Sequence, residues 1–172
     1  MKTVKILRIV SGGQSGADRA GLDAAIEAGI PHGGYCPHGR RSEDGTIPER
    51  YQLKETSSSG YTKRTEMNIV MSDCTLLFVG SGKLSPGSAK TAMFAESVNK
   101  PCLLVPVANL SEGHLAGQIV DWFETMQKDE LVVNVAGNRE SVCPGISEKV
   151  KSIMGMVFST MSKTRSHIEH VV

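Results

Sequence analysis

The chain has 172 residues, 40% of them hydrophobic, so it is long enough for one sizeable core and too short to need two. Its 19 basic and 18 acidic residues leave a formal net charge of +1, which gives no overall attraction to nucleic acid or to an anionic membrane. We therefore expect no nucleic-acid or membrane partner, and any bound anion must be held by local groups.

The first predicted strand, 6–10, runs into a glycine-rich loop, "SGGQSGADRAG". Gly12, Gly13 and Gly16 suit a sharp turn from strand to helix, and they let a bound group approach the backbone. Ser15 and Asp18 have the spacing of a capping box, which predicts a helix over 15–28. The free amides at such a helix start favour an anion. The alternative is that the glycines only permit the turn and that the polar residues only cap.

Two standard phosphate-binding motifs are absent from the chain. The glycines of the first loop have the wrong spacing for the GxGxxG dinucleotide fingerprint. Gly82 and Gly87 have the spacing of a Walker loop, but Ser88 stands where that loop has lysine. Neither a standard dinucleotide nor a P-loop nucleotide is indicated.

A weak strand is expected near 32–36, followed by the long connection "CPHGRRSEDGTIPERYQ". It exceeds the ~12–15 residues above which structureless loops become uncommon, and such loops are often functional. His32, Cys36 and His38 lie close in sequence, but no fourth ligand is nearby and zinc spacings are absent, so we expect no protein-ligated metal. The four scattered cysteines indicate reduced thiols and, without a signal peptide, a cytoplasmic protein.

The rest of the chain alternates between helical patterns and short apolar runs typical of strands buried on both faces. Helices are predicted at 61–71, 88–99, 113–126 and 144–162, and strands at 75–79, 103–107 and 131–135. This alternation predicts an α/β domain over 1–162 with a mainly parallel sheet. Residues 163–172 lack a core-facing period and are expected to fray.

Three loops in this pattern resemble one another. After the strands ending near Val10, Val79 and Val135, glycine and serine precede a helix each time, and Pro144 suits the first turn of the last one. In a parallel sheet these loops share the edge where α/β folds bind ligands. The pattern therefore indicates a phosphorylated ligand of nucleotide size.

The segments "SGGQSGADRAGLDAAIEAGIPHGGYCPHGRRSEDGTIPERYQLKET", "YTKRTEMNIVMSDCTLLF", "PGSAKTAMFA" and "NVAGNRESVCPGI" closely resemble the molybdenum carrier protein family, the molybdenum cofactor carrier proteins. That family is related to the lysine-decarboxylase-like nucleotide-binding Rossmann superfamily. The resemblance implies a Rossmann-like three-layer sandwich that carries or protects molybdenum cofactor, or a related phosphorylated pterin or nucleotide, without turnover. It also implies a dimer or tetramer, with molybdoenzymes or cofactor-biosynthesis proteins as further partners.

Carried over by motif, the resemblance implies a ligand site built from several segments. Arg40 and Arg41, in the long loop, are its expected anion ligands, and Glu43 and Asp44 are expected to pair with them. The full set of expected ligand-binding residues is Gly12, Gly13, Gln14, Ser15, Gly16, Arg19, Arg40, Arg41, Arg64, Thr65, Asn68, Gly80, Ser81, Gly87, Ser88, Thr91, Asn138 and Arg139. For the arginines and for the helical face of Arg64 and Asn68, a purely structural role is the alternative.

Enzymes of the superfamily carry a PGGxGTxxE motif whose glutamate serves catalysis. Here "PGSAKTAMF" puts Phe94 at that position, and Glu96 lies about 200° round the helix from it. We therefore expect no catalytic residue and favour a binding protein. Two alternatives stay open: a nucleotide phosphoribohydrolase, and a non-catalytic module that senses a nucleotide.

Overall fold

A five-stranded parallel sheet forms the centre of the protein, in a computed structural model that describes residues 4–169 and the side chains of residues 4–163. The strand order is β2-β1-β9-β7-β8, and each neighbouring pair is parallel. The strands are β1 (Lys5–Val10), β2 (His32–Gly33), β7 (Cys74–Val79), β8 (Cys102–Pro106) and β9 (Glu130–Gly137). All four strands predicted from continuous apolar runs are present.

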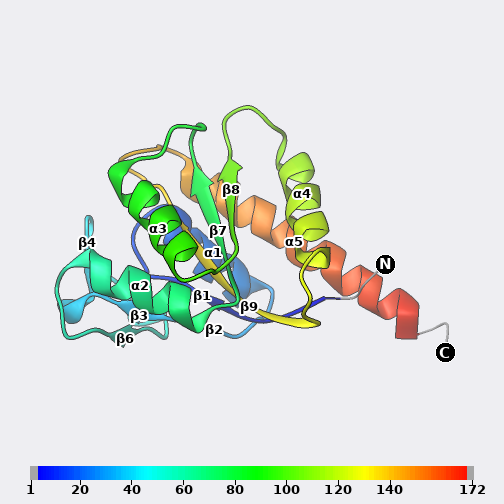
Figure 1. The fold of residues 1–172 in the computed structure, drawn as a ribbon, viewed down its shortest axis with the longest axis horizontal. Coiled ribbons are helices and arrows are strands. Elements are labelled where there is room, and N and C mark those ends of the chain that lie inside the picture. The colour runs from blue at the N-terminus through cyan, green and yellow to red at the C-terminus, as the bar shows by residue number, and fades with distance from the viewer. Residues whose placement is uncertain (1–3, 170–172) are drawn as a thin grey trace.

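Helices cover both faces of this sheet (Figure 1). On one face lie α1 (Ala17–Glu27), α4 (Glu112–Glu124) and α5 (Ile146–Glu169), which pack on one another and on the sheet. On the other face lie α2 (Tyr61–Met71) and α3 (Pro86–Ser97). The protein is thus a Rossmann-like three-layer α/β sandwich with a mainly parallel sheet, as predicted.

The larger apolar cluster lies between the sheet and the helices α1, α4 and α5. Strand β7, with every residue buried, contributes to both faces: Leu76 and Phe78 join this cluster, and Leu77 joins a smaller one under α3. A strand buried on both faces is apolar at nearly every position, and the exception in β7, Thr75, accepts a hydrogen bond from Asn134 at 3.1 Å. This explains why the sequence of β7 shows no alternation.

The long connection after β2 is folded, which agrees with its excess over the length above which structureless loops become uncommon. It contains β3 (Tyr35–Cys36), the short 3-10 helix η1 (His38–Arg40), the hairpin strands β4 (Arg41–Ser42) and β5 (Gly45–Thr46), and β6 (Lys54–Glu55), which pairs with β3. A separate apolar cluster anchors the segment, formed by Leu22, Cys36, Ile47, Tyr51 and Leu53.

The single short strand predicted over 32–36 is in fact two strands in two sheets. Gly34, with φ +123°, separates them, and a Cβ there would lie 2.4 Å from the Ser11 carbonyl oxygen. Helix α5 also differs from prediction, because it begins after Pro144, at Ile146, and continues to Glu169. Residues 170–172 of the predicted tail lie outside the described residues.

Within residues 4–169, no helix is long and apolar enough to cross a bilayer.

Candidate anion-binding site

Three loops meet at the carboxyl edge of the sheet, because β9 lies between β1 and β7. Asn138, just after β9, joins them: its Oδ1 accepts from the Gly80 amide at 2.9 Å. Its Nδ2 donates to the hydroxyls of Ser85 and Ser88, at 3.2 Å each. Its carbonyl oxygen accepts from the Ala17 amide, at the start of α1. The predicted convergence of the loops is therefore confirmed, and Asn138 serves as their connector.

The glycines of the first loop allow the chain to pack against itself. Gly16 has φ +84°, and a Cβ there would lie 2.4 Å from the Asn138 carbonyl oxygen. A Cβ on Gly12 would lie 1.9 Å from Arg64 Nη1. Gly13, with φ +74°, faces Leu53 from the long connection. The space beside these glycines is thus filled by protein atoms, which favours the structural alternative for Gly12, Gly13 and Gly16.

The predicted capping box is wrong. Helix α1 begins at Ala17, and its N-cap is Gly16, which has no side chain to accept a hydrogen bond. The Asp18 carboxylate accepts from the amide of Gln14 at 3.3 Å, and the Ser15 amide donates to Gln14 Oε1 at 3.0 Å. The turn at Gly16 moves Ser15 outside the helix, so its hydroxyl is available to other partners.

Three buried polar atoms beside the first loop have no hydrogen-bond partner among the described residues. They are Ser11 Oγ, Gln14 Nε2 and Arg64 Nε. The Gln14 side chain is oriented by its other end, since Oε1 also accepts from the Glu43 amide at 2.9 Å. An unpaired buried donor costs about 1–3 kcal/mol. Such donors are suited to an acceptor that the chain itself does not supply.

Two arginines bring positive charge to this loop. Arg64 pairs with Asp18 at 2.9 Å, where the side chains are 11% and 4% exposed. Burial raises the pKa of Asp18 above its usual value, although Arg64 and the Gln14 amide act to lower that pKa. The guanidinium carbons of Arg64 and Arg139 lie 5.9 and 4.7 Å from the centre of the Tyr61 ring. The two predicted ligands Arg64 and Arg139 are therefore brought together.

The Glu43 carboxylate accepts hydrogen bonds from the polar groups next to these arginines. Glu43 accepts from the Ser15 hydroxyl, from the Ser141 hydroxyl at 2.5 Å and from the Ser141 amide at 3.3 Å. Its Oε2 also lies 3.9 Å from Arg139 Nη1. These hydrogen bonds and the arginine outweigh desolvation and hold the pKa of Glu43 below its usual value.

We call Gln14, Ser15, Arg64, Arg139 and Ser141 the donor cluster. Four of these residues were predicted, and Ser141 was missed, as was the Tyr61 ring that the two arginines share. Ser141 directly follows the "NRE" of the third loop, so the signal was its place beside Asn138 and Arg139. The role of Tyr61 had no sequence signal, because it depends on where α2 begins in space.

Arg40 does not take the ligand position predicted for it. Its guanidinium is buried and donates to main-chain carbonyl oxygens at 2.9–3.2 Å, those of Ile47, Pro48, Tyr51 and Leu53. Because these bonds occupy its donors, Arg40 folds the long connection and is not free to bind an anion. The backbone at Arg40 has a positive φ of 50°, at the end of the short helix η1.

The predicted pairing of the two acids with Arg40 and Arg41 is also wrong. Asp44 pairs with Arg19, whose Nη2 lies 2.8 Å from Asp44 Oδ1 and whose Nε donates to the Gly13 carbonyl oxygen at 3.0 Å. Arg41 is exposed on the hairpin. Arg19 is thus held between the first loop and the hairpin.

Three other predicted site residues make bonds within their own elements or to β3. Thr65 Oγ1 donates to the Tyr61 carbonyl oxygen, and Thr91 Oγ1 donates to that of Gly87. Asn68 is buried and bonds both main-chain groups of Tyr35, at 2.8 and 2.9 Å. These contacts favour the structural alternative for Thr65, Asn68 and Thr91.

The second loop offers the most open backbone of the site. A Cβ on Gly87 would meet no atom within 4 Å, and Ser81 is exposed. Ser88 is buried, and its amide donates to Ser85 Oγ, the N-cap of α3. Of this predicted group, Gly80 and Ser88 are joined to Asn138, while Ser81 and Gly87 face open space.

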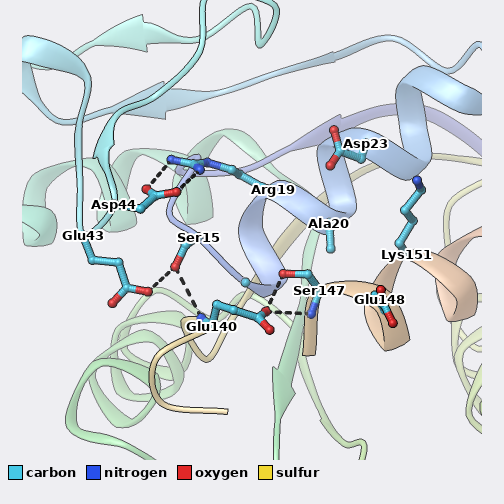
Figure 2. Close-up of a pocket in the computed structure, with 11 residues that line it drawn as sticks. Ser15, Arg19, Ala20, Asp23, Glu43, Asp44, Glu140, Ser147, Glu148 and Lys151 are labelled. Atoms are coloured by element: carbon cyan, nitrogen blue, oxygen red, sulfur yellow. Dashed lines mark hydrogen bonds and ion pairs between the residues drawn. The ribbon is translucent and has the colours of Figure 1, made fainter. Parts of the chain in front are cut away.

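A cavity of about 370 Å³ lies beside the first loop, between α1, α5 and the hairpin (Figure 2). Its charged lining is mostly acidic and consists of Asp23, Glu43, Asp44, Glu140, Glu148, Arg19 and Lys151. Glu140 faces the start of α5, where its carboxylate accepts from the amide and hydroxyl of Ser147. This lining disfavours an anion in the cavity, so the donor cluster, which shares only Ser15 with the cavity lining, is the better candidate for an anion site.

The three residues considered as metal ligands have other partners. His32 Nε2 accepts from the Gln52 amide, His38 lies 3.3 Å from Glu55, and Cys36 is buried, which raises the pKa of its thiol. Within the described residues, no group of three or more His, Cys, Asp or Glu side chains is arranged to hold a metal ion.

Comparison with known proteins identifies the family. Residues 9–158 match the model of the Circularly permutated YpsA SLOG family. Among solved structures, the chain is similar to a protein described as a "Putative molybdenum carrier protein" from Syntrophus aciditrophicus SB, with 42% identity and a TM-score of 0.84, over 90% of this chain and 96% of that one. A search of curated proteins gives no match. The resemblance to molybdenum carrier proteins is confirmed, and the chain belongs to the circularly permutated YpsA SLOG family.

Proposed function

We propose that the protein binds the phosphate of a small ligand through the donor cluster and carries that ligand without changing it. The observation that supports this most strongly is the group of unpaired buried polar atoms, Ser11 Oγ, Gln14 Nε2 and Arg64 Nε, at the carboxyl edge of the sheet. A phosphate monoester offers several acceptor oxygens and a negative charge, which suit amide, hydroxyl and guanidinium donors.

We propose molybdenum cofactor as the ligand class. The solved relative is described as a molybdenum carrier, and it matches this chain over most of both lengths. Molybdenum cofactor has a phosphate at one end and a pterin that holds the metal at the other. The Tyr61 ring and the guanidinium of Arg139, 4.7 Å apart, offer a flat surface for a pterin beside the phosphate donors.

Binding without turnover is supported by the residues at the site. Phe94 stands where the related enzymes have their glutamate, and Glu96, two residues along, is exposed. Glu43 is committed to Ser15 and Ser141. A general acid or base must reach the reacting group, and neither Glu43 nor Glu96 is free at the donor cluster to do so.

One observation favours a second function, a nucleotide phosphoribohydrolase. Asp18 is a buried carboxyl group whose pKa is raised by that burial, and such groups often serve as catalytic acids. Its contacts argue against this role, because the Gln14 amide and Arg64 Nη1 both donate to Asp18 Oδ2 and so favour the carboxylate over the protonated acid. If the protein released adenine from AMP and Asp18→Asn abolished that release, the carrier proposal would be wrong and the phosphoribohydrolase would take its place.

The test is to add molybdenum cofactor, AMP and ADP-ribose separately to the purified protein. We expect molybdenum cofactor to raise the melting temperature, since saturation at 100 times the dissociation constant adds about 2.7 kcal/mol to the free energy of unfolding. The pterin fluorescence should stay with the protein after desalting. Stabilisation by AMP or ADP-ribose alone would contradict the proposed ligand and favour a nucleotide sensor.

A further inference from the structure

Glu43 accepts hydrogen bonds from the donors that the proposed function assigns to a phosphate. Its carboxylate receives hydrogen bonds from the Ser15 hydroxyl and from both the hydroxyl and the amide of Ser141, and it faces Arg139 (Figure 2 shows the contact with Ser15). Three hydrogen bonds and a nearby guanidinium form the surroundings that a phosphate oxygen would have. A ligand phosphate and the Glu43 carboxylate cannot use these donors at the same time.

The segment that holds Glu43 is attached mainly by polar contacts. Strands β4 and β5 pair over only two residues each, and Arg41, Gly45 and Thr46 are exposed. Two polar contacts attach the hairpin to the first loop and α1: Asp44 pairs with Arg19, and the Glu43 amide donates to Gln14 Oε1. Because the tip of the hairpin packs no large apolar side chain, opening it exposes little apolar surface.

The same contact covers an unpaired donor. Gln14 Oε1 accepts from the Glu43 amide, while Gln14 Nε2 is buried and has no partner among the residues that the structure describes. If Glu43 moves away, the Gln14 side chain loses one of its covering groups. Displacement of the hairpin therefore frees Ser15 and Ser141 and uncovers Gln14 together.

We infer that Glu43 is an internal competitor of the ligand, a carboxylate that fills the phosphate subsite in the free protein and lowers the affinity for any phosphate-bearing ligand. This inference deepens the proposed function and rests on it. Glu43 thereby sets the specificity of the site: an anion must make better hydrogen bonds to Ser15, Ser141 and Arg139 than the carboxylate does. When the ligand dissociates, the Glu43 carboxylate again accepts hydrogen bonds from Ser15 and Ser141.

The variant that tests this is Glu43→Gln. Glutamine keeps the shape and one acceptor oxygen but removes the charge, so the closed state is weakened without a cavity. We expect affinity for AMP and for molybdenum cofactor to rise about tenfold, since the donors hold a neutral amide oxygen more weakly than a charged carboxylate. The melting temperature without ligand should fall by a few degrees. A merely structural Glu43 would lower both stability and affinity.

Glu148→Gln is the matched control. Glu148 is exposed and lines the same cavity as Glu43, so this variant also removes one negative charge, but at a position away from Ser15 and Ser141. Its affinity should equal that of the unmodified protein. Equal gains in both variants, or unchanged or weaker binding by Glu43→Gln alone, would overturn the inference while leaving the proposed function intact.

A second measurement separates failure of the inference from failure of the proposed function. In the absence of any ligand, the Ser141 amide should exchange its hydrogen about tenfold faster in Glu43→Gln than in the unmodified protein, because the acceptor carboxylate is weakened. Equal exchange would overturn the closed contact itself. If no phosphate-bearing ligand binds either protein, the proposed function fails, and the competitor role fails with it.

Discussion

At the scale of single residues, Arg40 and Arg139 have opposite roles although the sequence suggests similar ones. Arg40 is the last residue of the short helix η1, and Arg139 lies in the loop after β9. Arg40 donates to four carbonyl oxygens of residues 47–53, whereas Arg139 contacts a ring and a carboxylate and is 38% exposed. Only a structure can separate these cases, since the hydrogen bonds of Arg40 go to main-chain atoms that any sequence supplies, beside an ion pair with the exposed Glu49 at 3.4 Å.

Replacement of Arg40 should therefore affect folding. Arg40→Ala leaves four carbonyl oxygens without their donor, and we expect a loss of about 3–5 kcal/mol in the free energy of unfolding. Arg41→Ala, the exposed neighbour, should change it by about 0.5 kcal/mol or less. Urea unfolding of both variants gives the comparison, and similar stabilities would contradict the structural role of Arg40.

Asp18 should give stability a dependence on pH. Its pKa is raised in the folded protein by burial. Between its unfolded pKa of about 3.9 and the higher folded pKa, the folded state binds more protons, so the contribution of Asp18 to stability falls as pH rises. Asp18→Asn should remove this loss. The stability of the variant relative to the unmodified protein should thus increase from pH 4 upwards and level off above the folded pKa.

Urea unfolding at several pH values between 4 and 8 measures this difference. A relative stability of Asp18→Asn that is constant, or that falls with rising pH, would show that Arg64 dominates the pKa of Asp18.

At the scale of elements, the junction between β1 and α1 depends on one backbone conformation. Gly16 has φ +84°, and a Cβ there would meet the carbonyl oxygen of Asn138 at 2.4 Å. Gly16→Ala should cost about 3 kcal/mol or more in stability, because both strain and a backbone clash result. Gly29→Ala is the control: φ is +67°, but a Cβ would meet no atom within 4 Å, so about 1 kcal/mol is expected.

Denaturation with guanidinium measures both variants. Equal losses would indicate that strain alone matters and that the loop does not pack closely on Asn138.

The start of α5 is capped by a carboxylate from outside the helix. Glu140 accepts from the amides of Gly145 and Ser147 and from the Ser147 hydroxyl. Burial acts to raise the pKa of Glu140, but the Ser147 hydroxyl and these amides hold that pKa below its usual value. Glu140→Gln should lose about 1–2 kcal/mol at pH 7. Because the folded pKa is depressed, the advantage of glutamate is present above its unfolded pKa of about 4.3 and disappears as pH falls through the folded pKa.

Thermal unfolding of the two proteins at pH 7 and near pH 3 checks this. A difference that persists unchanged at low pH would contradict a charged cap.

The elements differ in how far sequence predicts them. The positions of strands β1, β7, β8 and β9 follow from their nearly continuous apolar runs. The predicted burial on both faces is confirmed for β7 and for most of β9, but it is wrong for β1 and β8, where Leu7 and Leu104 are exposed. The internal structure of the 37–53 segment does not follow from the sequence, because its order comes from Arg40 and from the Ile47, Tyr51 and Leu53 cluster. Those contacts span irregular separations along the chain and show no helix or strand period.

At the scale of the whole molecule, strand order brings the three loops together. Placing β9 between β1 and β7 puts Asn138 and Arg139 beside the first and second loops. Sequence could predict that the loops share an edge, since parallel strands end together. It could not predict that Glu43 would reach Ser15 and Ser141, because that contact depends on a hairpin with no apolar pattern.

The most direct test of the account is the affinity for molybdenum cofactor of the unmodified protein, Arg139→Ala and Arg50→Ala, measured by calorimetric titration. Arg50 pairs with Asp23 and stacks on Tyr51, away from the donor cluster. We predict that Arg139→Ala binds at least about tenfold more weakly and that Arg50→Ala binds like the unmodified protein. Equal affinity of all three proteins would contradict a phosphate site at the donor cluster.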